Sequence, residues 1–421
     1  MPGEVNLQTV LNRSLFQALP TPQKIYALIH VLPTGEGVSV QTPLNLGLVL
    51  DRSGSMAGDK IRNLREAVKL ILGRMSTQDL VSIVLFDDNV DTLVSCQPVG
   101  NLQQLTAQVD RITDRGGTTM SKGMRRGLDE LRRGLTQDRV SRMLLLTDGE
   151  TYGDEDTCRQ IATECGQYGV AISALGLGED WNMALLEAIA QGSSGAVDHL
   201  ATPDKIMLEF QRALKSMQST VVRNAQLTLR FVAGVTPAAA WRVLPTISQL
   251  NARALSDRDL QLPLGDLERN KGQSVLVELV MQTKPAGAYR IAQTDVSYDV
   301  PAAGMTGEHV RQDILISLSD DPSQVSPLNA DVMNLVEKVS VFKLQTRALN
   351  EAQAGNIAAA TQQLRTAATR LLNLGEVDLA QAAQQEADNL EQQGQMSVSG
   401  TKKLQYGTRK LTQRLDDVDT P

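Results

Sequence analysis

The chain has 421 residues, more than one ordinary hydrophobic core accommodates, so we expect two or three domains. Hydrophobic residues make up 42% and charged residues 21%, which is typical of soluble globular proteins. The net charge of −7 argues against nucleic acid or an anionic lipid surface as the main partner, because both bind basic surfaces.

The cysteines and the apolar runs indicate the compartment. Cys96, Cys158 and Cys165 are odd in number and form no CxxC pair, so we expect neither a disulfide framework nor a zinc site. Cys158 and Cys165 are seven apart on an expected helix, and we predict that both are buried as small hydrophobic residues. The first residues show no secretory signal, and no apolar run reaches the ~20 residues that span a bilayer. We therefore expect a cytoplasmic protein without membrane insertion.

An α/β pattern occupies residues 43–217. Strands are expected at 44–50, 81–86, 143–146 and 170–175, and helices at 60–75, 102–112, 121–135 and 156–168. The strands are continuously apolar rather than alternating, which is typical of parallel strands covered on both faces. The pattern predicts a doubly wound, Rossmann-like domain.

Residues 218–322 have a different pattern of apolar residues. Apolar residues alternate at 226–231, 275–281, 292–298 and 313–318, and Pro and Gly separate the runs. Alternation without intervening helices predicts an antiparallel β-sandwich. Segment 1–42 contains one more strand-like run at 24–31, which we expect to join the sandwich. The α/β domain would then be an insertion between sandwich strands.

The C-terminal part reads as helical. Residues 323–394 predict a small helical hairpin or array, interrupted near Gly355 and Gly375, which are helix-stop signals. Their separation of 20 is shorter than a tetratricopeptide unit, so a repeat solenoid is not favoured. Residues 395–421 form a polar tail that either docks as one more helix or stays loose.

Polar side chains follow the expected strands of the α/β domain at the points where they end. In doubly wound sheets, ligands bind beyond the C-terminal edge of the strands, where loops from distant parts of the sequence meet. Two carboxylates and three hydroxyls suit a hard cation such as magnesium, manganese or calcium rather than zinc. These residues are Asp51, Ser53, Ser55, Thr118 and Asp148.

The same residues carry a family resemblance. The turn Asp51-x-Ser53-x-Ser55, the loop Gly116-Gly117-Thr118 and the strand end Thr147-Asp148-Gly149 resemble the metal-ion-dependent adhesion site of von Willebrand factor type A (VWA) domains. The flanking sequences are similar to the intracellular bacterial branch. The resemblance covers about residues 43–217, and the rest is similar, more loosely, to bacterial relatives with a flanking β-sandwich and a helical tail.

The resemblance implies a role for each residue. Ser53 and Ser55 would bind one divalent cation directly, and Thr118 directly or through water according to state. Asp51 and Asp148 would act mostly through water. Thr118 is assigned rather than its neighbour because it follows the glycine pair. Mg²⁺ is the expected ion, with Mn²⁺ or Ca²⁺ as alternatives.

Other interpretations of these acidic and hydroxyl residues are simpler. Asp51, Ser53 and Ser55 could merely cap a turn, but capping does not explain Thr118 and Asp148. The run 154–156 could be a second cation site, yet a solvated loop that caps the following helix is the favoured interpretation. The same holds for the acidic pair at 87–88.

The leading functional hypothesis is a protein-binding module. Its ion would complete its coordination with a Glu or Asp carboxylate from a partner protein. A second hypothesis is a scaffold whose ion only stabilises loops, while the sandwich or helical tail binds partners. Metal-assisted hydrolysis is less favoured because no base is evident: His30, His199 and His309 lie near no Ser nucleophile motif, and no GxxxxGK loop exists. We therefore expect no enzymatic activity.

Overall fold

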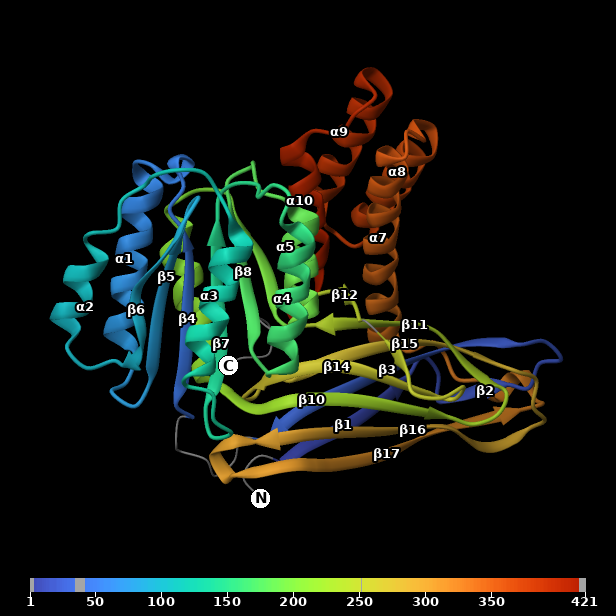
Figure 1. Ribbon diagram of the computed structural model, residues 1–421. Coiled ribbons are helices and arrows are strands. Elements are labelled where there is room, and N and C mark those ends of the chain that lie inside the picture. Colours follow the sequence, from blue (N-terminus) through green and yellow to red (C-terminus); the bar gives the residue numbers. More distant parts are fainter. Residues whose placement is uncertain (1–3, 35–41, 251, 416–421) are drawn as a thin grey trace.

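The computed structural model describes residues 4–34, 42–250 and 252–415, so the remaining parts of the predicted segments 1–42 and 395–421 lie outside it. An α/β unit stands beside a two-layered β unit, and a group of helices rises from the β unit next to the α/β unit (Figure 1). The predicted fold class is confirmed: a Rossmann-like unit, an additional β region and a helical region.

The α/β unit is a six-stranded sheet with the order β6-β5-β4-β7-β8-β9. Its strands are β4 (Leu44–Asp51), β5 (Leu80–Phe86), β6 (Val90–Pro98), β7 (Val140–Thr147), β8 (Ala171–Leu177) and β9 (Ala196–Leu200). All neighbouring pairs are parallel except β5 with β6, which forms an antiparallel edge. Every residue of β4 is buried, as the continuous apolar run predicts for a central strand.

Helices cover both faces of this sheet. One face packs against α1 (Asp59–Arg74), α2 (Leu102–Val109) and α6 (Lys205–Gln218). The other packs against α3 (Met120–Arg132), α4 (Glu155–Gln167) and α5 (Met183–Gly192). Cys158 and Cys165 are buried in α4, and burial raises the pKa of both thiols to about 12. Both are packing residues, as predicted.

The β unit consists of two sheets, β1-β3-β15-β11-β12 and β13-β14-β10-β16-β17-β2, with a shared apolar core between them. The first contains β1 (Glu4–Leu11), β3 (Gln23–Thr34), β11 (Val235–Leu244), β12 (Ser248–Gln249) and β15 (Gln273–Met281). The second contains β2 (Leu15–Gln17), β10 (Thr220–Phe231), β13 (Arg253–Ala254), β14 (Asp259–Glu268), β16 (Gly287–Val300) and β17 (Met305–Ser319). Pairing is antiparallel except between β17 and β2.

The N-terminal strand β3 lies inside the sandwich, paired with β15 along nine residues from Gln273 to Met281. Because β10 also belongs to the sandwich, the chain leaves it after β3, builds the α/β unit and returns at β10. The α/β unit is therefore an insertion between two sandwich strands.

The helical region contains α7 (Ala330–Gln353), α8 (Ile357–Asn373), α9 (Val377–Gln393) and α10 (Val398–Arg409). Gly355 and Gly375 adopt positive φ values of 81° and 78°, which fits their role as helix stops. Helix α7 packs on the outer face of the first sandwich sheet, where Phe342 meets Trp241 with ring centroids 6.0 Å apart. The helices thereby bury the second face of that sheet.

The part of the polar tail that the structure describes, residues 395–415, is docked, which decides between the two alternatives left by the sequence. Helix α10 lies against the α/β unit, and Lys402 stacks over the ring of Trp181 at 4.3 Å. Arg409 pairs with Glu187 of α5 at 2.7 Å, and Lys410 with Asp198 of β9 at 2.9 Å. Three of the basic residues that make the tail polar, Lys402, Arg409 and Lys410, are therefore docking contacts. Among the described residues, no helix is long and apolar enough to cross a membrane.

Candidate metal centre

The sheet topology brings the predicted residues to one edge. Asp51 is the last residue of β4, and Asp148 directly follows β7. These two strands are neighbours in parallel register, with Leu50 opposite Leu146, so their ends lie side by side. The loop that carries Thr118 ends at the start of α3 and reaches the same edge.

Hydrogen bonds connect four of the five side chains. The Ser53 and Ser55 hydroxyl oxygens lie 3.0 Å apart, and Ser55 Oγ donates to Asp148 Oδ1 at 2.7 Å. Asp51 accepts hydrogen bonds from the Ser53 backbone N–H at 2.8 Å and from Thr147 Oγ1 at 2.6 Å. Asp51, Ser53 and Asp148 are buried, whereas Ser55 is exposed, so the network opens to solvent on one side.

Thr118 joins this group beside Gly149. A Cβ placed on Gly149 would lie 3.9 Å from Ser55 Oγ and 4.0 Å from Thr118 Oγ1, so both hydroxyls border the space that this glycine leaves free. Thr118 is half-buried. The structure thus brings all five predicted residues together.

Backbone hydrogen bonds join the Asp51–Ser55 turn to the loop that carries Thr118. The Gly54 N–H donates to the Gly116 carbonyl at 3.0 Å, and the Arg115 N–H donates to the Arg52 carbonyl at 2.8 Å. The Gly117 N–H donates to Asp88 Oδ2 at 2.9 Å. These hydrogen bonds hold the Thr118 loop against the Asp51–Ser55 turn.

The acidic pair at 87–88 supports this loop, and the expectation of a solvated segment is wrong for Asp87. Asp87 is 1% exposed and pairs with Arg52 at 2.6 Å and Arg115 at 3.0 Å. Burial acts to raise its pKa, but hydrogen bonds from the Asn89 N–H and the two guanidinium groups hold the pKa below its usual value. Asp87 stays ionised and anchors the arginines that flank the site, a role that its position after a strand could not reveal.

Asp154 also acts differently from the expectation. It does not cap the helix that follows it; instead its Oδ2 accepts the Ser121 N–H at 2.8 Å at the start of α3. Its Oδ1 accepts a hydrogen bond from Thr151. Asp156, by contrast, is exposed and pairs with Arg159 on the same helix. Asp154 thus helps to hold the helix that begins after Thr118.

The site carries more negative than positive charge. Burial raises the pKa of Asp51 to about 6, against hydrogen bonds from Thr147 and Ser53 that lower it, and the nearby Asp148 charge raises it further. Asp148 forms an ion pair with Lys60, a residue that the sequence interpretation missed. Its position five residues beyond Ser55, in the first turn of α1, was the available signal.

The donor set fits a divalent cation. The described residues contain no cluster of three or more His, Cys, Asp or Glu, so hydroxyls must contribute as much as carboxylates. Such an all-oxygen set suits Mg²⁺, Mn²⁺ or Ca²⁺. Burial disfavours the ionised form of Asp51, and within the described ranges Lys60 is the one cation that pairs with a carboxylate of the site, so an additional positive charge would be favourable there.

Gly116 has a conformational requirement that can be tested. Its φ is +71°, and an added Cβ would lie 2.8 Å from Asp88 Oδ2. We expect Gly116→Ala to destabilise the protein by about 1–2 kcal/mol in urea unfolding. Gly73→Ala is the matched control: Gly73 lies in α1 with nothing within 4 Å of an added Cβ, and this change should stabilise by about 0.5–1 kcal/mol. Equal effects of the two changes on stability would contradict a special conformational requirement at Gly116.

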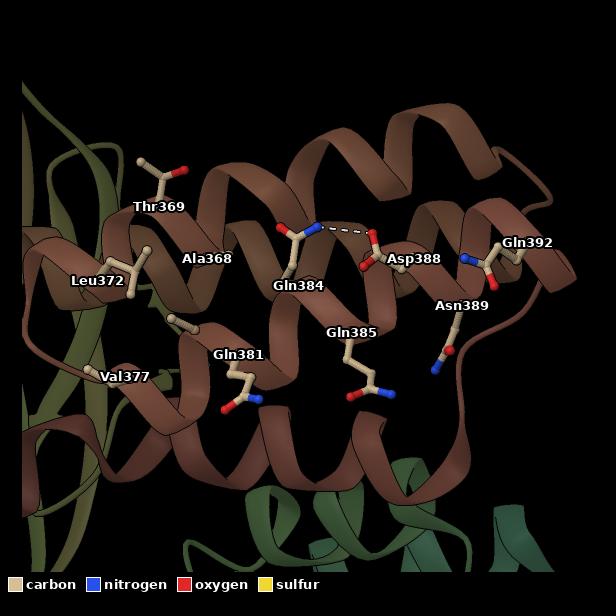
Figure 2. A pocket seen from close by; sticks show the side chains of 11 residues that line it. Ala368, Thr369, Leu372, Val377, Gln381, Gln384, Gln385, Asp388, Asn389 and Gln392 are labelled. Atoms are coloured by element: carbon tan, nitrogen blue, oxygen red, sulfur yellow. Dashed lines mark hydrogen bonds between the residues drawn. The ribbon is translucent and has the colours of Figure 1, made fainter.

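The helical region carries an open groove on its surface. This groove of 640 Å³ runs along α8 and α9, and Figure 2 shows glutamine and asparagine side chains projecting along it from α9. Leu372 and Val377 form its apolar end and are 56% and 60% exposed. The groove combines amide donors and acceptors with a small apolar patch.

Comparison with known proteins defines the class. Residues 45–213 match the von Willebrand factor type A domain family, in agreement with the strand order and the residues at the sheet edge. Residues 45–213 thus form a VWA domain. Residues 330–414, which span α7 to α10, match the Sll0103-like C-terminal alpha-helical domain family.

Individual relatives extend the similarity to the whole chain. The Synechocystis sp. protein sll0103 is 28% identical over 374 residues, which are 86% of this chain and 87% of that protein. A von Willebrand factor type A protein from Catenulispora acidiphila has the same fold, with a TM-score of 0.78, 15% identity and 97% of each chain covered. The inter-alpha-trypsin inhibitor heavy chain H3 of Rattus norvegicus is 30% identical over 199 residues, 44% of this chain but 22% of that protein.

Proposed function

We propose that the protein is a metal-dependent interaction module that captures an acidic residue of a partner protein. The observation that carries the proposal is the network of Ser53, Ser55 and Asp148, buried on one side and open to solvent at Ser55. VWA domains generally mediate protein–protein interactions, which supports the same function.

Each residue of the site has a distinct task in this proposal. The Ser53, Ser55 and Thr118 hydroxyls would hold the ion, and Asp51 and Asp148 would supply the opposing charge around it. The ion, Mg²⁺ in the first place, would supply Lewis acidity toward a partner carboxylate. Two backbone hydrogen bonds, from Gly54 to Gly116 and from Arg115 to Arg52, hold the two loops together, which supports this arrangement.

No catalytic role is proposed, since each of the three histidines contacts residues that do not belong to the site. His30 Nδ1 lies 2.8 Å from Ser274 Oγ, and His309 Nδ1 lies 2.8 Å from Asp295 Oδ1. His199 stacks with Tyr406 at 5.8 Å between ring centroids. A cytoplasmic location is part of the proposal, supported by three unpaired cysteines.

The proposal is tested by titrating the full-length protein with Mg²⁺ in a calorimeter. We expect one ion per chain, with binding abolished by excess EDTA. Mn²⁺ should compete for the same site, which can be followed by its paramagnetic relaxation of water. Absence of any Mg²⁺ or Mn²⁺ binding would overturn the proposal.

The groove on α8 and α9 supports a second candidate, a scaffold that captures partners through its helical region. Removing residues 325–421 would not test it cleanly, because α7 covers Trp241 and Leu276 of the sandwich and α10 contacts the α/β unit. The better variant is Val377→Asp with Gln385→Arg, which changes only the groove surface. Loss of partner capture with unchanged Mg²⁺ affinity would favour the scaffold.

A further inference from the structure

Lys60 brings a cation of the chain itself into contact with the candidate metal centre. Its ammonium group pairs with Asp148 Oδ2, and the other oxygen of Asp148 accepts the Ser55 hydroxyl at 2.7 Å. The Asp148 side chain is 0% exposed, whereas that of Lys60 is 28% exposed. Asp148 is therefore shared between the serine network and Lys60.

No other cation of the described residues pairs with a carboxylate of the site. The nearby arginines are engaged elsewhere: Arg52 and Arg115 both pair with Asp87 and Asp91. Asp51 receives its hydrogen bonds from neutral donors, the Ser53 N–H and the Thr147 hydroxyl. Lys60 is thus the residue that sets the net charge around Asp51 and Asp148.

We propose that Lys60 tunes this centre toward anionic ligands, weakening its hold on the divalent cation and strengthening its attraction for a partner carboxylate. Asp51 and Asp148 carry −2 and Lys60 carries +1, so the site without an ion carries −1. A divalent ion would bring it to +1. Without Lys60 the loaded site would be neutral and would attract an anion less. The inference rests on the proposed function and specifies the charge of its ligand.

The first test is the Mg²⁺ affinity of a charge-neutral variant. Lys60→Gln keeps a hydrogen-bond donor near Asp148 but removes the charge, so we expect Mg²⁺ to bind about tenfold more tightly than in the native protein. Lys60→Met, which keeps only the apolar stem, is the second variant and should shift the affinity in the same direction. Lys69→Gln is the matched control, because Lys69 lies on the same helix and pairs with Glu66 and Asp110 at the surface.

The second test measures the attraction for an anion without requiring the partner. Acetate at constant ionic strength should raise the apparent Mg²⁺ affinity of the native protein. If bound Mg²⁺ increases the affinity for acetate, bound acetate must increase the affinity for Mg²⁺ by the same factor. With free Mg²⁺ corrected for its acetate complex, we expect this gain to shrink severalfold in Lys60→Gln and to persist in Lys69→Gln.

A purely structural role for Lys60 predicts a different result. If Lys60 only holds Asp148 in place, both variants at this position should bind Mg²⁺ more weakly, and that outcome would overturn the inference while leaving the metal site intact. Unchanged Mg²⁺ affinity would overturn it too. If the native protein itself binds no Mg²⁺, the proposed function fails first.

Thermal unfolding gives an independent readout. Without metal, the two Lys60 variants should melt at a lower temperature than the native protein, because Asp148 loses its buried ion-pair partner. Mg²⁺ should then raise the melting temperature of the variants more than that of the native protein.

Discussion

Replacing Ser53 and Ser55 together by alanine is expected to weaken Mg²⁺ binding at least about a hundredfold and to abolish capture of an acidic partner. The two hydroxyls lie 3.0 Å apart and Ser55 donates to Asp148, so the double change removes two of the three hydroxyl ligands. The turn itself should persist, because the backbone N–H of residue 53, which alanine retains, donates to Asp51.

The loss of one hydrogen bond to Asp148 should cost only about 1 kcal/mol of stability, measured by urea unfolding without metal. Ser76→Ala serves as the control, since Ser76 lies beyond α1 and is exposed. A double variant that binds Mg²⁺ within about threefold of the native protein would place the ion elsewhere.

Replacing Asp51 by asparagine should separate stability from metal binding. The pKa of Asp51 is raised from 3.8 to about 6 by burial, so its carboxyl stabilises the metal-free fold fully below pH 3.8 and this stability is lost as the pH rises through 6. Near neutral pH the native protein therefore bears the cost of a buried charge. Asparagine removes that charge and can still accept a hydrogen bond from the Ser53 N–H.

We expect metal-free Asp51→Asn to gain up to about 3 kcal/mol near neutral pH and almost nothing near pH 4. Mg²⁺ should then stabilise the native protein but not the variant. Urea unfolding at the two pH values, with and without Mg²⁺, measures both effects. If the metal-free variant is less stable than the metal-free native protein at neutral pH, the charge of Asp51 does not destabilise the fold.

The strongly patterned elements could be predicted from the sequence. The sequences of β4 and β7 are continuous apolar runs, because both faces of each strand are buried. Once these strands were placed, Asp51 and Asp148 followed as strand-end residues. The structure brings all five predicted residues of the site to one edge, as the topology of parallel strands requires.

Elements at the margins of the α/β unit gave no such signal. The edge strand β6 has mostly exposed or half-buried side chains, so its sequence shows no continuous apolar run. β9 is five residues long and has a single buried residue, Leu200, at its end. Both strands depend on pairing with β5 and β8 rather than on their own pattern.

Ion pairs between residues far apart in the chain could likewise not be predicted from the sequence. Lys60 and Asp148 are 88 residues apart, and the docking pair Arg409 and Glu187 is more distant still. Charged residues in a polar stretch usually remain solvated, and only the tertiary structure shows which carboxylate each one meets. The buried state of Asp87 has the same origin, since its two arginine partners come from separate loops.

The most direct test of the proposed function is partner capture by the immobilised full-length protein from its native extract, in Mg²⁺ and in EDTA. The captured protein is identified, and its Glu and Asp residues are then replaced in turn. We expect capture in Mg²⁺, loss in EDTA, loss with the Ser53 and Ser55 double variant, and loss on replacing one acidic residue of the partner. Capture that is equally strong in EDTA and with the double variant would contradict a metal-dependent interaction.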